Sequence, residues 1–266
     1  MPPSDWIDSH FHVFRRPGGV APGARYLPPY GSDFASWHDT APSTAPRRGV
    51  LVQTSFLGTD NTELLAELQA HPQTLRGVAV IDPQTGCDQL DALHKAGVRG
   101  IRLNLAGAGR ADLDVARLPG PLADALAAHR WNVELHTDPG ALPGVLERID
   151  RRLTVVLDHF GRPASTHADD PTFRAVTARL AAGSAAVYVK LSGAYRLGGL
   201  DPRALAGIWR DLLGSRRLLW GSDWPCTNHE DRADYPALLG ALGGWLEDPA
   251  EQRQVLLDNP LALYWA

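Results

Sequence analysis

The feature that most constrains the fold is a regular alternation of short apolar runs with longer amphipathic segments along nearly the whole chain. Each run is rich in apolar and β-branched residues, ends at polar or turn residues, and precedes a segment with helical periodicity. Eight such runs span residues 6–14, 49–55, 75–82, 100–105, 131–137, 153–161, 187–193 and 218–225. Strand and helix alternating eight times predict an α/β fold, the parallel (β/α)8 TIM barrel.

The segments between the runs have the signals of helix ends. Several begin with proline near the first turn and finish with glycine, as helices prefer. The predicted helices cover residues 60–71, 87–97, 120–130, 140–150, 171–183 and 201–214, and two further helical pieces follow at 235–246 and 249–257. An open doubly wound sheet is the main rival, but no GxGxxG turn follows the first run. We therefore expect one barrel domain over residues 1–266.

One connection is far longer than a barrel crossover requires. Residues 15–48 contain many prolines and glycines, with a short helix predicted near residues 33–38. Long loops in compact domains are usually functional lids or binding loops. We expect this segment to cover the mouth of the barrel, and a surface excursion is the alternative.

Composition excludes several classes of function. The formal net charge is -4 and no long basic run occurs, which argues against nucleic acid or a membrane surface as a partner. The two cysteines, Cys87 and Cys226, are far apart and form no CxxC motif, so neither a disulfide framework nor a zinc ribbon is indicated. No apolar run approaches the roughly 20 residues of a membrane span. We expect a soluble cytoplasmic protein with a small-molecule partner; a homo-oligomer is compatible with the sequence.

Polar residues are concentrated at the carboxyl ends of the predicted strands, where barrel enzymes place their active sites. These strand-end residues are His10, His12, Arg102, Asn104, His136, His159, Lys190, Ser192 and Asp223. By contrast, His71, His94 and His129 lie near predicted helix ends, where an imidazole complements the helix dipole. The agreement of six strand ends predicts a single site at the barrel mouth.

The first strand carries two imidazoles two residues apart. Alternation predicts that Asp8, His10 and His12 share one face. Two such imidazoles, with a third from another strand and a carboxylate, supply the nitrogen and oxygen ligands that zinc prefers. The same residue types also permit catalysis without a metal, in which imidazoles donate hydrogen bonds to a carbonyl oxygen while Asp223 takes a proton from water. The sequence leaves both versions open.

Two arginines are expected near the mouth. Arg102 and Asn104 alternate with apolar residues and so point into the barrel or its mouth, while Arg196 follows the seventh strand. Converging guanidiniums predict a substrate carboxylate held in bidentate fashion. The structural alternative is that Arg102 pairs with a buried acid such as Glu134 or Asp158.

Lys190 lies within the seventh predicted strand. A buried ammonium requires a counter-ion. We expect Lys190 to be an internal counter-ion to Asp8 or Asp223, in preference to a direct catalytic role.

Six motifs occur in order across nearly the whole chain: "DSHFHVF" (8–14), "GVRGIRLNL" (97–105), "LDHFGRP" (157–163), "VKLSGAYR" (189–196), "WGSDWP" (220–225) and "DNPLALY" (258–264). With them the chain resembles the amidohydrolase superfamily, amidohydrolase-related family 2. Within it, the chain is similar to the branch of 2-pyrone-4,6-dicarboxylate lactonases and related sugar-acid lactonases. The resemblance implies a metal-dependent-hydrolase-like TIM barrel and a hydrolase, a lactonase acting on a carboxylic ester bond.

The resemblance also implies roles for individual residues. His10, His12, His159 and Asp223 would form the catalytic centre, in which the aspartate activates water and the histidines polarise the lactone carbonyl. The substrate-binding candidates within or beside these motifs are Arg102, Asn104, Tyr195, Arg196 and Trp224. The substrate would be a small molecule that carries a carboxylate.

The resemblance leaves the cofactor open. Members of this branch can work without a metal, whereas other branches use a histidine at the end of the fifth strand as a ligand, which His136 matches here. One divalent metal, zinc, would then be held by His10, His12, His136 and Asp223. With His136 as a ligand, the alternative activity is a zinc-dependent decarboxylase of an aromatic or muconate-type acid.

Two departures from the family pattern affect the expected substrate. Cys226 follows "GSDWP", where relatives commonly have a histidine, and residues 106–110 read "AGAGR", where readers of dicarboxylates tend to have another basic group. The resemblance therefore implies lactone hydrolysis more strongly than it implies the pyrone dicarboxylate itself.

Overall fold

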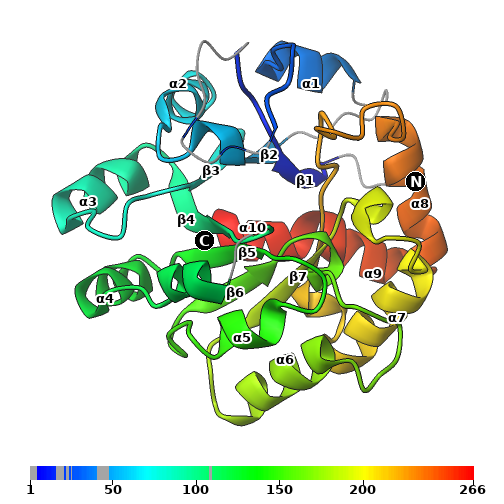
Figure 1. Cartoon of the computed structure of the whole chain (residues 1–266). Helices are drawn as coiled ribbons and strands as arrows, with labels where there is room; N and C mark the ends of the chain where they lie inside the picture. The colour runs from blue at the N-terminus through cyan, green and yellow to red at the C-terminus, as the bar shows by residue number, and fades with distance from the viewer. Residues whose placement is uncertain (1–4, 16–20, 22–23, 25, 41–47, 108–109) are drawn as a thin grey trace.

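The computed structural model describes residues 5–15, 21, 24, 26–40, 48–107 and 110–266. Eight strands form one sheet in chain order, each parallel to the next (Figure 1). They are β1 (Ile7–Phe11), β2 (Arg48–Val52), β3 (Leu75–Ala79), β4 (Val98–Asn104), β5 (Asn132–His136), β6 (Thr154–Leu157), β7 (Val187–Leu191) and β8 (Leu218–Trp220). The segment after β8 returns to β1, where the amide of Asp223 donates to the carbonyl of His10 at 2.8 Å. The predicted (β/α)8 barrel is confirmed.

Helices surround the sheet, as Figure 1 shows. They are α1 (Phe34–Thr40), α2 (Thr62–Ala70), α3 (Cys87–Lys95), α4 (Gly120–Ala128), α5 (Leu142–Leu146), α6 (Pro171–Ala181), α7 (Pro202–Leu213), α8 (Tyr235–Trp245), α9 (Pro249–Arg253) and α10 (Asn259–Tyr264). The N-caps of α6 to α9 are aspartates whose carboxylates accept a backbone N–H of the first turn: Asp170, Asp201, Asp234 and Asp248. An aspartate followed within two residues by proline therefore starts each of these helices. No helix in the described part of the chain is both long and apolar enough to cross a membrane.

The end of the chain differs from its prediction. Instead of one helix over 249–257, α9 passes into a wider π-helical turn at Gln254–Asp258, and α10 follows. Tyr264 of α10 is fully buried beside apolar strand residues such as Val50 and Leu219. Apolar side chains and α10 thus fill one end of the barrel interior, and the polar residues occupy the other.

The long connection is described only in part, because residues 16–20, 22–23, 25 and 41–47 lie outside the described residues. Its predicted short helix is confirmed as α1. Tyr26 and Tyr30 both donate a hydrogen bond to Glu230 Oε1 in the loop after β8, the first at 3.1 Å. This contact joins the connection to the barrel mouth, and its role as a cover stays a prediction.

The prediction that Asp8 shares a face with His10 and His12 is wrong. The pairing of β1 with β2 shifts its register between Asp8 and Phe11, and such a bulge breaks the alternation of side chains. Asp8 and Phe11 consequently both contact Trp37 of α1, through a 3.1 Å hydrogen bond from the indole and a stacked ring pair at 4.1 Å. Asp8 is an outer-layer residue, whereas the two histidines face the barrel interior.

Candidate active site

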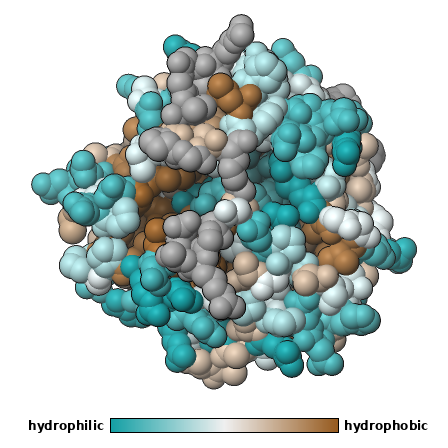
Figure 2. Space-filling view, in the orientation of Figure 1, coloured by the Kyte–Doolittle hydropathy of each residue, from teal (hydrophilic) through white to brown (hydrophobic). Residues whose placement is uncertain are grey.

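A cavity of about 500 Å³ opens at the carboxyl ends of the strands. It is lined by eight of the predicted site residues: His12, Arg102, Asn104, His136, His159, Tyr195, Arg196 and Asp223. His10 is fully buried beside it. Trp224 does not line this cavity, because its indole packs against the hydrophobic core. Figure 2 shows hydrophilic residues around the centre of this face.

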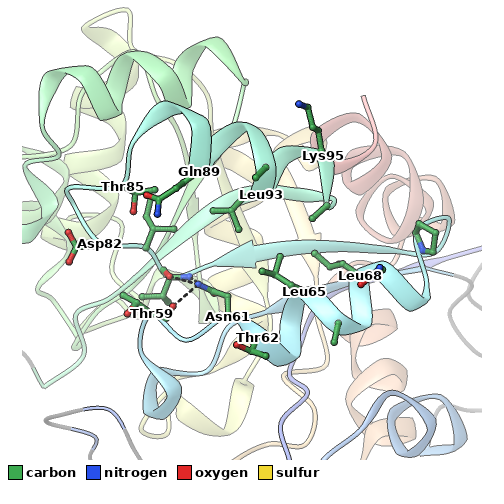
Figure 3. Close-up of a pocket in the computed structure, with 17 residues that line it drawn as sticks. Thr59, Asn61, Thr62, Leu65, Leu68, Asp82, Thr85, Gln89, Leu93 and Lys95 are labelled. Carbon is green, nitrogen blue, oxygen red and sulfur yellow. Dashed lines mark hydrogen bonds between the residues drawn. The ribbon is translucent and has the colours of Figure 1, made fainter.

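A larger groove of about 1050 Å³ lies elsewhere, between α2 and α3 (Figure 3). Its lining is mostly apolar, with Leu65 and Leu93 facing one another across it. None of the predicted site residues lines it. The larger volume of this groove therefore does not make it the active site. The smaller cavity at the barrel mouth, which holds the predicted residues, is the candidate active site.

Asp223 is the most heavily contacted acid in the cavity. Its Oδ2 accepts hydrogen bonds from Tyr195 Oη and Arg196 Nε, both at 2.7 Å. Its Oδ1 lies 3.3 Å from His12 Nε2 and 3.5 Å from His10 Nε2. The backbone at Asp223 has φ +60, a left-handed conformation that a non-glycine residue adopts at a cost and that is found at functional sites.

The surroundings keep Asp223 ionised. Burial alone would raise the pKa of this carboxyl, but the Arg196 guanidinium and the neighbouring imidazoles outweigh burial and hold the pKa well below its usual range. Burial also raises the pKa of Tyr195 well above its usual value, so its phenol stays protonated and donates to Asp223. Tyr195 and Arg196 thus hold the aspartate, besides lining the cavity.

His159 projects into the mouth from an unusual turn after β6. Residues 159–162 all have positive φ, between +44 and +68. The turn places His159 Nδ1 3.0 Å from Ser192 Oγ and Nε2 4.0 Å from Asp223 Oδ2. Burial lowers the pKa of His159 to about 4, although Asp223 and Asp158 oppose this. His159 is therefore a neutral imidazole near pH 7.

The low pKa of His159 predicts a pH-dependent stability. The unfolded chain titrates near 6.5, so between pH 6.5 and 4 it binds a proton that the folded chain does not. The free energy of unfolding should be fully maintained above pH 6.5 and fall by about 3 kcal/mol from this residue as the pH drops to about 4. Urea unfolding of chelator-treated wild type and His159→Asn from pH 7.5 to 4.5 tests this. Equal pH slopes for the two proteins would contradict the prediction.

Gly193 makes room for the His159 ring. It has φ +55, and a Cβ built on it would lie 2.7 Å from His159 Nδ1. Gly193→Ala should therefore displace the imidazole and lower kcat at least tenfold, since a misplacement of about 1 Å can cost 10²-fold. Gly183→Ala is the matched control, because Gly183 has φ +72 but no atom within 4 Å of its built Cβ. Steady-state kinetics of both variants checks this, and equal losses of kcat would contradict it.

His136 does not join the other proposed metal ligands. Its Nε2 lies 3.4 Å from Arg162 Nη1, and its ring stands edge-to-face on His159 with centroids 4.9 Å apart. His159 in turn lies 5.2 Å from the His10 ring, so it occupies the space between His10 and His136. The four-residue zinc group that includes His136 is not brought together, because β5 stands across the barrel from β1.

Three atoms nevertheless form a group that could hold a metal. His10 Nε2, His12 Nε2 and Asp223 Oδ1 are separated from one another by 3.3 to 3.5 Å. His12 Nδ1 lies 2.7 Å from the carbonyl of Val52, which only accepts, so Nδ1 carries a proton and the neutral form of the ring has its lone pair at Nε2. Zinc ligands at about 2.0–2.2 Å have mutual distances of this order. The donor set therefore fits one divalent cation.

A buried network of charges lies beneath His10. Arg102 donates from Nε to Asp158 Oδ2 at 3.1 Å and from Nη1 to the carbonyl of Gln53 at 3.3 Å. The alternative in which Arg102 pairs with a buried acid is therefore confirmed, and that acid is Asp158. The Arg102 side chain also lines the cavity. Asp158 Oδ1 reaches His10 Nδ1 at 3.3 Å.

Lys190 has a different counter-ion from the ones predicted. Its Nζ donates to Glu134 Oε2 at 2.6 Å and lies 3.7 Å from Asp158 Oδ1. Asp8 and Asp223 are not its partners in the described ion pairs, because Asp8 is on the outer face and Arg196 holds Asp223. Both Lys190 and Glu134 are fully buried.

Sequence reasoning missed several residues of the cavity. Arg162 lines it three positions after His159, within the quoted motif "LDHFGRP", but no strand periodicity applies in the left-handed turn. Tyr26 also lines the cavity and comes from the long connection, where no pattern singles it out.

Two residues named in the sequence analysis have notable surroundings. Asn104, which was predicted, has a buried Oδ1 without a hydrogen-bond partner among the described residues. Burial raises the pKa of Cys226 to about 12, so this thiol is not a nucleophile near neutral pH.

Comparison with known proteins identifies the family. The family model described as "Amidohydrolase" matches residues 7–265. A 2-pyrone-4,6-dicarboxylate hydrolase of Comamonas testosteroni is 30% identical over 99% of this chain and 91% of its own length. A 4-sulfomuconolactone hydrolase of Hydrogenophaga intermedia is 28% identical over 99% of this chain and 89% of its own. A crystal structure from Acinetobacter baumannii, named a probable 2-pyrone-4,6-dicarboxylic acid hydrolase, superposes with a TM-score of 0.86 at 31% identity, covering 98% of this chain and 100% of the other. The chain belongs to the amidohydrolase family.

Proposed function

We propose that this protein is a lactonase that opens a carboxylate-bearing lactone, similar to 2-pyrone-4,6-dicarboxylate lactonases. The observation that carries the proposal is a buried aspartate, Asp223, held by Tyr195 and Arg196 beside a histidine cluster, in a cavity that also presents guanidiniums. The names of the two curated relatives support the same reaction class.

In the proposed reaction, a water beside Asp223 attacks the ring carbonyl carbon and gives a proton to the carboxylate. The carbonyl oxygen becomes an oxyanion that accepts hydrogen bonds from the imidazoles around the mouth, His159 among them. The bond between the carbonyl carbon and the ring oxygen then breaks, and the ring oxygen takes up the proton. The product is an open-chain acid with one new carboxyl group and one new hydroxyl group.

The low pKa of Asp223 keeps the carboxylate charged but makes it a weak base. Its effectiveness as a proton acceptor must therefore come from its position beside the attacking water. Tyr195 and Arg196 both donate to Oδ2, and these two hydrogen bonds fix the carboxylate in one orientation. A divalent metal on His10, His12 and Asp223 would supply Lewis-acid polarisation of the carbonyl when bound.

The substrate carboxylate is proposed to bind to arginines that line the cavity. Arg102, Arg162 and Arg196 all line it, and guanidiniums bind carboxylates through paired N–H donors. Arg162 adds a third guanidinium to the pair, Arg102 and Arg196, that was predicted from the sequence. Asn104 would contribute a side-chain amide beside them.

The decarboxylase alternative rested on His136 as a metal ligand. His136 lies outside the group formed by His10, His12 and Asp223 and instead contacts Arg162. The geometry therefore favours the hydrolase.

A panel of carboxylated lactones and carboxylated aromatic acids assayed in ¹⁸O-labelled water tests the proposal. We expect lactone opening with one labelled oxygen in the new carboxyl group and no release of carbon dioxide. Carbon dioxide release from an aromatic acid, without opening of any lactone, would support the decarboxylase and overturn the lactonase.

A further inference from the structure

The Nδ1 atom of His10 is contacted by two groups that require different protonation of that nitrogen. Its Nδ1 lies 3.3 Å from Lys190 Nζ and 3.3 Å from Asp158 Oδ1. The ammonium is only a donor and needs a lone pair on Nδ1, whereas the carboxylate is only an acceptor and needs a proton there. A neutral imidazole has one proton, so it satisfies one of the two. The choice also decides whether Nε2 is a donor or a lone pair.

The surroundings of Nε2 decide which form is stable without a cation. In its neutral form His12 presents a lone pair at Nε2, since its Nδ1–H donates to the carbonyl of Val52. If His10 carried its proton at Nδ1, its Nε2 lone pair would face that lone pair at 3.3 Å and the Asp223 carboxylate at 3.5 Å. A proton on His10 Nε2 removes this repulsion and supplies a donor between the two acceptors.

The opposite form suits a bound cation. With the proton at His10 Nδ1, the Asp158 carboxylate accepts it, and three lone pairs converge from His10, His12 and Asp223. This is the arrangement in which a carboxylate orients a metal-bound histidine. Asp158 therefore favours the metal-binding form, and Lys190 favours the other one.

Lys190 is held in place from the far side. Glu134 Oε2 accepts from its Nζ at 2.6 Å, and Glu134 Oε1 accepts from Tyr264 Oη of α10 at 2.7 Å. All three side chains are buried. The ammonium cannot turn away to solvent, so one of its N–H groups stays directed at His10 Nδ1 while another donates to Glu134.

We infer that Lys190 is a positioning residue that holds His10 as an Nε2–H donor and opposes the binding of a divalent cation by His10, His12 and Asp223. The inference rests on the proposed function, since His10 is one of the imidazoles that surround Asp223, the proposed base. Lys190 touches neither substrate nor reacting atoms in this account. It acts through His10.

The test measures tautomer and zinc affinity rather than turnover. Chelator-treated wild type and Lys190→Met are labelled with ¹⁵N-histidine, and the His10 signal is assigned by its loss in His10→Gln. We expect Nε2–H in the wild type and Nδ1–H in Lys190→Met. Titration with zinc ion against a competing chromophoric chelator should show a dissociation constant at least tenfold lower in Lys190→Met, as for other changes in groups that orient metal ligands.

Two further variants keep the test decisive. Lys95→Met removes the chain's other lysine, which is exposed on α3, and should change neither readout. Lys190→Met/Glu134→Gln removes both members of the buried pair and carries the test if the single variant does not fold. Nδ1–H in the wild type, or unchanged zinc affinity after loss of Lys190, would overturn the inference. Neither readout depends on lactone hydrolysis, so failure of the proposed function would be seen separately.

Discussion

Asp223→Asn is expected to lower kcat by about 10²- to 10⁴-fold while the fold is kept, because the amide cannot accept the proton of the attacking water. The side chain keeps its shape, so Tyr195 and Arg196 retain an oxygen to which they can donate. Steady-state kinetics on a lactone that the wild type opens, with circular dichroism to check folding, measures the effect.

Asp138→Asn is the matched control for this substitution. Asp138 is another carboxylate of the same cavity, but it accepts a backbone hydrogen bond from Gly107 and lies outside the histidine cluster. Its loss should change kcat far less than the loss of Asp223. Turnover by Asp223→Asn within tenfold of the wild type would show that another group is the base.

Asp158→Asn is expected to have the largest effect on stability. The Asp158 carboxylate faces Arg102, His10 and Lys190 in the barrel interior, where all of these groups are buried. Removing one member of a buried charge cluster leaves the others uncompensated, which typically lowers the free energy of unfolding by about 3–5 kcal/mol. Urea denaturation measures it.

Asp124→Asn provides the comparison. Asp124 pairs with Arg152 at 2.7 Å, but both side chains are more than half exposed. Exposed ion pairs contribute little, so this variant should unfold at nearly the wild-type urea concentration. Similar midpoints for the two variants would mean that the buried network does not stabilise the barrel.

The fold could be predicted from the sequence because its signals are local. Eight apolar runs, with prolines and aspartates at helix starts, specify strands and helices without knowledge of their neighbours. The end of α9 could not be predicted, since the switch to a π-helical turn at Gln254–Asp258 depends on what packs against it.

The sequence predicted which residues lie near one another at the candidate site, but not which of them form ion pairs or hydrogen bonds with each other. The rule that barrel sites lie at the carboxyl ends of the strands predicted that His10, His12, His159 and Asp223 meet, and the structure places them side by side. The partners of Arg196 and Lys190 depend on register and on distance across the barrel, which periodicity does not contain. A one-residue bulge was sufficient to move Asp8 to the other face of β1.

The contact between Tyr264 and Glu134 has a consequence for biosynthesis. The two residues are 130 positions apart, so Glu134 and Lys190 leave the ribosome well before Tyr264. Until then the Glu134–Lys190 pair lacks its third member, and the barrel interior stays open to water at the end that α10 fills. We therefore expect nascent chains halted before α10 to be much more sensitive to protease than nascent chains that include α10.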